Sequence, residues 1–362
     1  HGYTISERTI AALSKKYGDL RAERQPDSFA GYALDLASDR SHVRLSLGQK
    51  VVEAARSHVP ELVDGAPLGL PEGQKLMALA DSLALPPEGE RPAKLSAKQR
   101  RIQQLIGCLK FIERVHPRLS LIVHRLSCVM SCPPLAAWDV ARAALASVWG
   151  ERDVGIKFGG SGLASARLGG LLKAHIDLTK PAPGELEAHS DATWGDRNVY
   201  ALVLTYAGAA VLFCTKKISL IVDSSMEAEA IGSAKAGELV TVARDVLRAI
   251  GVPPAAPTLL GTDNYSNMRV ATGEGCPSRS RHFLRRYHVL RRRIAEGEII
   301  MRHVRDEEMP ADCLTKWTPK NKLEKSLCYL CNTHGRAALG DASEGADPIE
   351  PAIEAATAAW LA

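Results

Sequence analysis

The chain contains 362 residues, of which 46% are hydrophobic and 24% charged, and its net charge is +5. This balance is typical of a globular protein and excludes collagen, a coiled coil and wholesale disorder. The length favours two or three domains, and apolar runs stay well short of the ~20 residues that a membrane helix needs.

The first half of the chain alternates between short and helical patterns. Residues 8–58 predict a helix over 9–16, a strand pair over 29–36 and 42–47, and a helix from Gln49. Six prolines in 59–95 predict a linker with at most one short helix, over 74–83.

A helical region is expected next. Apolar residues recur at helical spacing over 96–132, with breaks at Pro117 and Pro133, and a further helix is expected over 135–149. Glycine-rich sequence over 159–170 then separates this helical region from the second half of the chain.

The segment 186–316 predicts a mixed sheet flanked by helices, an α/β fold. Its expected strands are 186–194, 199–207, 209–222 with a break at 215–217, 258–262 and 298–304. Its expected helices are 225–250, 264–271, 284–295 and a short one from Ala311. Beyond Arg336 the chain is acidic and rich in alanine, which predicts a mobile extension.

The positive charge is concentrated in one window. Between Arg269 and Arg305 there are ten arginines and three acids, a net +7, so the rest of the chain carries −2 by difference from +5. Arginine suits bidentate contacts with phosphates, but a solvated helix face would give the same pattern. The candidate nucleic-acid-binding residues are Arg281, Arg285, Arg286, Arg291, Arg292 and Arg293.

Four acids stand where packing alone would not place them. Asp191 interrupts a predicted strand, which disfavours aspartate. Glu229 lies early in the long helix, Asp263 ends a strand and Asp312 begins a short helix. Each has a simpler explanation on its own, as a turn former or a helix-terminal charge. Their order on strand, helix, strand end and helix start favours a shared site.

Glu227 lies close to Glu229 but has a structural explanation. Ser224 and Glu227 fit a capping box, in which the Glu227 carboxylate folds back to the helix start. Glu229 points about 200° further round the helix. We therefore include Glu229 in the candidate site and leave Glu227 out.

Four converging carboxylates would repel one another unless cations bind between them. Two Mg²⁺ ions held by Asp191, Glu229, Asp263 and Asp312 would solve this and could hydrolyse a phosphodiester. His303, at the end of a strand nine residues before Asp312, is a candidate for proton transfer, with a plain surface histidine as the alternative.

Five sequence blocks resemble the ribonuclease H domain of copia-type retrotransposon polyproteins, in order and in spacing. They are HSDATWGDR, SSMEAEAIGSAKAGE, GTDNYSNM, SRSRHFLRRYHVLRRRIAEGEI and HVRDEEMPADCLTK. Upstream, SFAGYALDLASDRSHVRLSLGQKVV resembles the end of the reverse transcriptase domain, and residues 99–160 resemble the helical connection.

This resemblance implies a domain order along the chain. A reverse transcriptase remnant is expected over 1–58, a proline-rich linker over 59–95, and a helical connection over 96–182. A ribonuclease H-like domain with a mixed five-stranded sheet is expected over 183–318, followed by an extension over 319–362. The family's polymerase motif Tyr-x-Asp-Asp should precede His1, which itself indicates a fragment of a longer chain.

The resemblance also implies an activity. Asp191, Glu229, Asp263 and Asp312 match the family's metal-binding carboxylates and His303 its histidine. The family cleaves the RNA strand of RNA–DNA hybrids with Mg²⁺, for which Mn²⁺ can substitute. The expected partners are thus the hybrid and the missing polymerase part, and the expected location is intracellular, either cytoplasmic in particles or nuclear.

Two alternatives stay open. One is an inactive relic that only binds nucleic acid through the arginine window; the other is a connection module that needs the polymerase half.

Cys328-x-x-Cys331 with His334 is a weak zinc signal, because there is no second pair of cysteines. Buried or free thiols explain these cysteines better.

Overall fold

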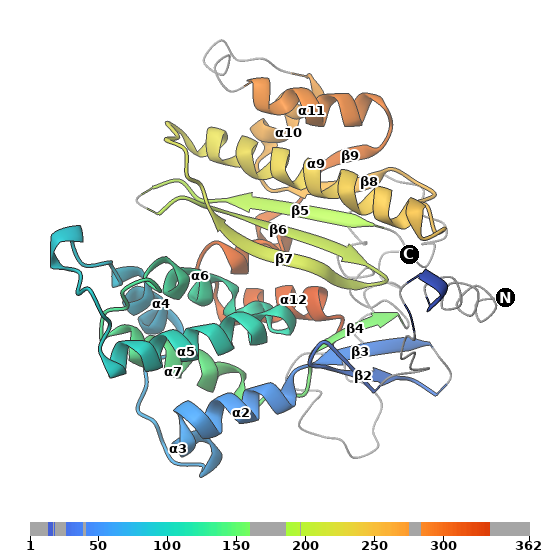
Figure 1. Cartoon of the computed structure of the whole chain (residues 1–362). Helices are drawn as coiled ribbons and strands as arrows, with labels where there is room; N and C mark the ends of the chain where they lie inside the picture. Colours follow the sequence, from blue (N-terminus) through green and yellow to red (C-terminus); the bar gives the residue numbers. More distant parts are fainter. Residues whose placement is uncertain are drawn as a thin grey trace, which may run out of the picture.

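The computed structural model describes residues 14–16, 18, 27–38, 41–159, 186–195, 197–274 and 284–333. Most of the helix expected over 9–16, the glycine-rich segment after 159 and the tail after Arg336 lie outside these residues. Two sheets and a group of helices make up the described part (Figure 1).

The smaller sheet has four antiparallel strands in the order β1-β2-β3-β4. The strand pair expected near the N-terminus is confirmed as β2 and β3. The fourth strand comes from the region for which only helices were expected, and it pairs with β3 over residues 42–45. The strands are β1 (Ser28–Phe29), β2 (Tyr32–Leu36), β3 (His42–Ser46) and β4 (Ile156–Gly159).

The helical region forms a separate apolar core. A capping box at Ser96 and Gln99 begins its longest helix, α5, whose buried positions recur at helical spacing. Its helices are α2 (Gly48–His58), α3 (Pro60–Val63), α4 (Gly73–Ser82), α5 (Ala97–Ile112), α6 (Ser120–Cys128) and α7 (Ala137–Trp149).

The proline-rich segment 59–95 is not a free linker, which corrects the expectation. The expected short helix is present as α4, but α3 and a 3-10 turn, Glu88–Glu90, also lie in this segment. Leu76, Ala80 and Leu83 are buried in the helical core. Arg197, from the larger sheet's first hairpin, donates a hydrogen bond to the carbonyl oxygen of Leu83 at 2.6 Å. Proline content alone could not reveal these contacts, because they depend on distant segments.

The larger sheet has the order β7-β6-β5-β8-β9. Within this sheet, β6 is antiparallel to both β5 and β7, while β8 lies parallel to β5 and β9 parallel to β8. The strands are β5 (Glu187–Ala192), β6 (Val199–Tyr206), β7 (Ala209–Lys217), β8 (Thr258–Thr262) and β9 (Ile299–His303).

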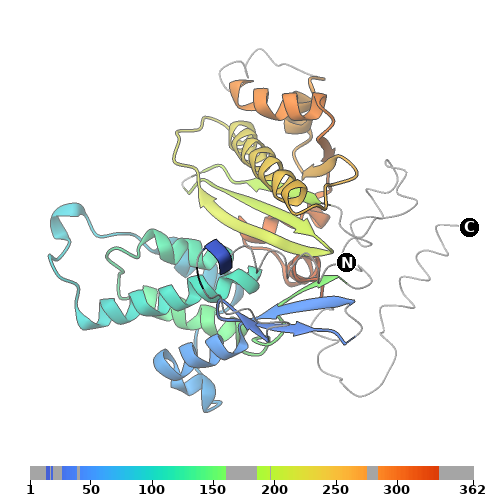
Figure 2. The same cartoon turned by 45° about the vertical axis from the view of Figure 1, so that its right-hand side comes forward.

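Helices cover both faces of this sheet (Figures 1 and 2). The long helix α9 (Ser225–Ala249) crosses one face, and α10 (Tyr265–Thr272) and α11 (Leu284–Ala295) lie beside it. Apolar residues of α9, α11 and the sheet share one core. Helix α12 (Lys320–Cys331) covers the other face, where a second core joins the two sheets.

Two predictions at the C-terminal end need correction. The helix expected from Ala311 is a 3-10 turn, Asp312–Leu314. Residues 320–331, expected in a mobile extension, form α12, and Leu330 is fully buried. The Tyr329 hydroxyl donates to Glu187 Oε2 at 2.9 Å and lies 3.0 Å from His189 Nε2, so α12 is attached to the central strand β5.

No helix in the described part of the chain combines the length and the apolar character that crossing a lipid bilayer would require.

Candidate active site

Sheet register brings the first two acids together. In the parallel pair β5–β8, His189 lies opposite Gly261. Two residues further along each chain segment come Asp191, in β5, and Asp263, directly after β8. Gly261 is required here, because a Cβ atom would come 2.4 Å from the His189 ring. The two aspartates therefore meet at the same edge of the sheet.

The structure brings all four predicted acids together. Carboxylate oxygens of Asp191, Glu229 and Asp263 lie within 4.8 Å of one another. A second group with the same spacing contains Asp263, Asp306 and Asp312. Asp191 and Asp312 are only 2% and 0% exposed, and Asp263 is half-buried.

Two of these carboxylates are held by hydrogen bonds. The backbone N–H of Ala192 donates to Glu229 Oε1 at 3.3 Å, and the Thr315 hydroxyl donates to Asp191 Oδ2. The other oxygen, Glu229 Oε2, is buried and has no hydrogen-bond partner among the described residues. An unsatisfied buried carboxylate oxygen is costly in a protein interior.

Burial and mutual repulsion change the pKa values of this group. Burial, and then the charge of Asp312, raises the pKa of Asp191 well above the usual range. Burial together with the charge of Asp191 raises the pKa of Glu229 further still, and the pKa of Asp263 is raised by burial and by Asp312. The site thus disfavours its own ionised state unless positive charge is added.

Two lysines supply part of this positive charge, and neither was predicted from the sequence. Lys316 Nζ lies 3.0 Å from Asp312 Oδ1, and Lys322 Nζ of α12 binds Asp312 Oδ2 and, at 2.9 Å, Asp306. Although burial opposes it, the charges of Asp191 and Asp312 raise the pKa of Lys316. Lys316 is the last residue of the fifth sequence block, so the resemblance could have pointed to it as a site residue. The contact between Asp306 and Lys322 could not be predicted in this way, because it depends on the tertiary fold.

The donor set fits divalent metal ions. All the candidate ligand atoms are carboxylate oxygens, the kind of ligand that Mg²⁺ prefers. One of them, Glu229 Oε2, has no hydrogen-bond partner in the described structure and is therefore available to an ion. The raised pKa values are the response expected of clustered acids without a cation. Asp191, Glu229 and Asp263 would hold one ion, and Asp312 is within reach of a second.

Glu227 takes the structural role expected of it. The Ser224 hydroxyl accepts the Glu227 N–H at 3.2 Å, which caps α9. The hydrogen bond from the Glu227 carboxylate back to the helix start differs from the prediction, because Glu227 Oε2 accepts from the N–H of Asp223 rather than from that of Ser224.

His303 lies beside the acidic cluster, at the exposed end of β9. Its Nε2 is 2.9 Å from the carbonyl oxygen of Asp263, and its ring packs edge-on against Tyr265. A carbonyl oxygen can only accept a hydrogen bond, so Nε2 carries the hydrogen and Nδ1 is the basic atom of the neutral ring. Its role in proton transfer stays a prediction.

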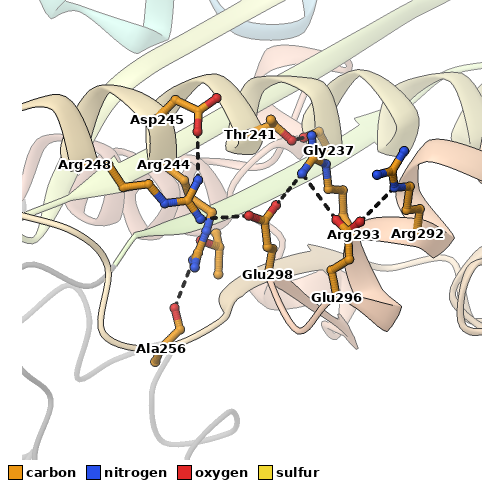
Figure 3. Close-up of polar contacts among 11 residues, drawn as sticks. Gly237, Thr241, Arg244, Asp245, Arg248, Ala256, Arg292, Arg293, Glu296 and Glu298 are labelled. Carbon is orange, nitrogen blue, oxygen red and sulfur yellow. Dashed lines mark hydrogen bonds and ion pairs between the residues drawn. The ribbon is translucent and has the colours of Figure 1, made fainter.

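Three candidate arginines of α11 bond to other residues of the described chain, and Figure 3 shows two of them, Arg292 and Arg293. Arg293 bonds to Glu298 at 2.9 Å and Arg292 to Glu296 at 2.7 Å. Arg291 donates twice to the carbonyl oxygen of Val270, at the last turn of α10.

The other three candidate nucleic-acid-binding arginines differ in what the structure shows of them. Arg285 is exposed, and Arg286 lies 3.8 Å from Glu227. Arg281 lies outside the described residues. A role of these side chains in nucleic-acid binding stays a prediction.

The possible zinc signal finds no support within the described residues. Cys331 is buried in α12 and Cys328 is partly buried. Neither of the two groups there that could hold a metal ion contains a cysteine. His334 lies outside the described residues.

The sheet order, the strand directions and the acids at the end of the central strands define a ribonuclease H-like domain, as the sequence predicted. No protein-family model matches the chain.

The chain is homologous to retrotransposon Pol polyproteins over part of its length, which confirms the resemblance noted from the sequence. It is 27% identical over 217 residues to the retrovirus-related Pol polyprotein from transposon RE2 of Arabidopsis thaliana, a match covering 59% of this chain and 14% of the relative. The corresponding proteins from RE1 of the same plant and TNT 1-94 of Nicotiana tabacum are 26% and 23% identical, also over 59% of the chain. The chain thus spans about one seventh of the length of these relatives.

Solved structures of ribonuclease H proteins also resemble part of the chain. LC11-RNase H1 isolated from compost is 16% identical, with 36% of this chain and 92% of that one covered and a TM-score of 0.30. A foamy viral protease-reverse transcriptase in complex with an RNA/DNA hybrid is 10% identical, with 88% of this chain and 34% of that one covered and a TM-score of 0.34.

Proposed function

We propose that this chain is a Mg²⁺-dependent endonuclease that cleaves the RNA strand of RNA–DNA hybrids during retrotransposon reverse transcription. The observation that carries the proposal is the convergence of Asp191, Glu229, Asp263 and Asp312 at one edge of a ribonuclease H-like sheet. Two divalent ions bound there would activate a water molecule and stabilise the departing oxygen.

The residues of the chain would contribute binding, orientation and proton transfer. Thr315 orients the Asp191 carboxylate and Ala192 orients that of Glu229, so that their oxygens face one point. His303 Nδ1 would take up or return a proton beside Asp263. The exposed part of α11 would contact phosphates of the hybrid, whose A-like shape can be recognised independently of sequence.

A second candidate function is hybrid binding without cleavage, as in a domesticated relic. Lys316 and Lys322 favour it, because they already place two positive charges on Asp312. Metal-dependent cleavage separates the two candidates. We further propose that the polymerase part of a reverse transcriptase is a partner and that the protein acts inside the cell.

Cleavage of a labelled RNA–DNA hybrid tests the proposal. We expect RNA cleavage in Mg²⁺ that stops in EDTA, and a loss of about 100-fold or more in Asp191→Asn. Asp245→Asn is the matched control, because Asp245 is an exposed acid at the far end of α9 and forms its ion pair with Arg248, away from the acidic cluster. Absence of metal-dependent cleavage by the unmodified protein, with hybrid binding retained, would favour the relic.

A further inference from the structure

A fully buried amide lies directly behind the candidate site. The side chain of Asn267, in α10, has no exposed surface. Its Nδ2 donates to Ser233 Oγ at 2.8 Å and to Thr262 Oγ1 at 3.2 Å, and its Oδ1 accepts from the Tyr287 hydroxyl at 2.6 Å. Both amide hydrogens and the amide oxygen are therefore engaged.

Two partners of this amide are neighbours of metal-binding candidates. Thr262, the last residue of β8, directly precedes Asp263. Ser233 comes four residues after Glu229 in α9, which puts the two side chains on the same side of the helix, one turn apart. A single side chain thus fixes the distance between the ends of β8 and α9.

The third carboxylate is attached through one further hydroxyl. The Ser233 Oγ lies 3.2 Å from the Oγ of Ser190, which directly precedes Asp191 in β5. Directly or through Ser233, Asn267 thus connects β5, α9 and β8. These are the elements that carry the group Asp191, Glu229 and Asp263, whose oxygens lie within 4.8 Å of one another.

We infer that Asn267 is a positioning residue, which sets the spacing of Asp191, Glu229 and Asp263 and thereby the metal affinity and the choice of ion. The inference rests on the proposed function of these acids. Mg²⁺ requires near-ideal octahedral geometry with short ligand distances, whereas larger ions tolerate looser sites. A change in spacing should therefore weaken Mg²⁺ binding more than Mn²⁺ binding.

Polar chemistry distinguishes this role from simple packing. The side chains of Ser190, Ser233, Thr262, Asn267 and Tyr287 are all fully buried. Apolar residues would fill the same space without the risk of unsatisfied groups. Hydrogen bonds, unlike apolar contacts, fix distances and directions between the joined elements.

Calorimetric titration of the metal-free protein with Mg²⁺ and with Mn²⁺ tests the inference. Asn267→Leu keeps the number and branching of the side-chain heavy atoms and removes the hydrogen bonds, so we expect the dissociation constant for Mg²⁺ to rise by about 10- to 100-fold and that for Mn²⁺ to rise less. Thermal unfolding of the same samples reports the loss of stability separately.

Thr258→Val is the matched control. Thr258 Oγ1 accepts a hydrogen bond from Arg244 at 3.0 Å, so this bond joins the same two elements, β8 and α9, at their opposite end (Figure 3 shows Arg244 there). We expect the variant to lower the melting temperature and to leave both dissociation constants unchanged. Equal weakening of metal binding by Thr258→Val and Asn267→Leu would overturn the inference.

Tyr287→Phe removes only one hydroxyl group, so it replaces Asn267→Leu as the test variant if that protein does not fold. It leaves Asn267 Oδ1 without its donor. We expect the dissociation constant for Mg²⁺ to rise, but by less than in Asn267→Leu. Unchanged constants in every folded variant would overturn the inference alone. If the unmodified protein binds neither ion, the proposed function fails and the inference fails with it.

Discussion

Asp191 shows most clearly how burial and charge act on one residue. It is nearly inaccessible, and its carboxylate faces two other acids and one hydroxyl donor. Burial raises its pKa to about 7. The acid is thus more easily protonated in the folded chain than in the unfolded one, and this difference makes the stability depend on pH.

The raised pKa determines the sign of this dependence. Without metal, the contribution of Asp191 to stability is fully present below pH ~4, its unfolded pKa, and is lost as the pH rises through about 7. We therefore expect the melting temperature in EDTA to fall between about pH 4 and pH 7. Mg²⁺ should reverse the fall, because it stabilises the ionised acids.

Scanning calorimetry at several pH values, with EDTA or with Mg²⁺, measures this effect. Asp191→Asn is the control, because an amide does not titrate in this range, and we expect it to flatten the curve. A melting temperature in EDTA that is constant or rises over this interval would contradict the expected electrostatics.

The helix α11 shows that one element can hold arginines with different tasks. Arg291 donates to the Val270 carbonyl, so it fastens α11 to α10. Arg292 is 78% exposed, and its partner is Glu296, one turn further along the chain. Exposed pairs of this type contribute only about 0.3–0.5 kcal/mol, so Arg292 can exchange Glu296 for a phosphate.

Single substitutions in α11 should separate these tasks. We expect Arg291→Ala to lower the melting temperature, because a buried carbonyl loses a charged donor at a cost of about 1.5–3 kcal/mol. We expect Arg292→Ala to leave stability unchanged, to weaken hybrid binding and to reduce its salt slope by about 1. Hybrid titrations at several salt concentrations measure this slope, and an unchanged slope would mean that Arg292 belongs to a solvated face.

The elements differ in how well the sequence predicted them. The strand over 258–262 has the expected limits, and the helix over 284–295 ends where expected, because Pro257, Asp263 and Gly297 mark these points. The four acids could be found because of their order on strand, helix, strand end and helix start, although each has a simpler explanation on its own. The Asn267 network and the Lys322–Asp306 pair could not, since their partners are distant in sequence and lie in patterns that ordinary packing explains.

The whole molecule is more integrated than the expected domain order suggests. Helix α12 comes after the predicted ribonuclease H-like segment yet covers one face of its sheet. At its end, the Asn332 side chain donates to the carbonyl oxygens of Lys157 and Gly159 in β4. The backbone N–H of Gly159 also donates to Ala207 at 2.7 Å, at the turn between β6 and β7. The smaller sheet, α12 and the larger sheet therefore meet at one place.

A substitution in α12 tests this integration. Leu330 is fully buried, so Leu330→Ala should destabilise the protein by about 2–5 kcal/mol. Lys320→Ala, in the same helix at a side chain that is 79% exposed, should change stability by about 0.5 kcal/mol at most. Chemical denaturation measures both values. A Leu330→Ala protein as stable as the unmodified one would mean that the helix is detached in solution.

The ammonium groups of the two lysines that contact Asp312 affect how far the acidic cluster depends on a metal ion. Small zinc domains stay unfolded without their ion, because the free energy of metal binding supplies the free energy of folding. Here Lys316 and Lys322 compensate part of the acidic charge from within the chain. The acidic cluster of the folded chain is thus partly neutralised from within, and a divalent ion bound there would compete with these two lysines for Asp312.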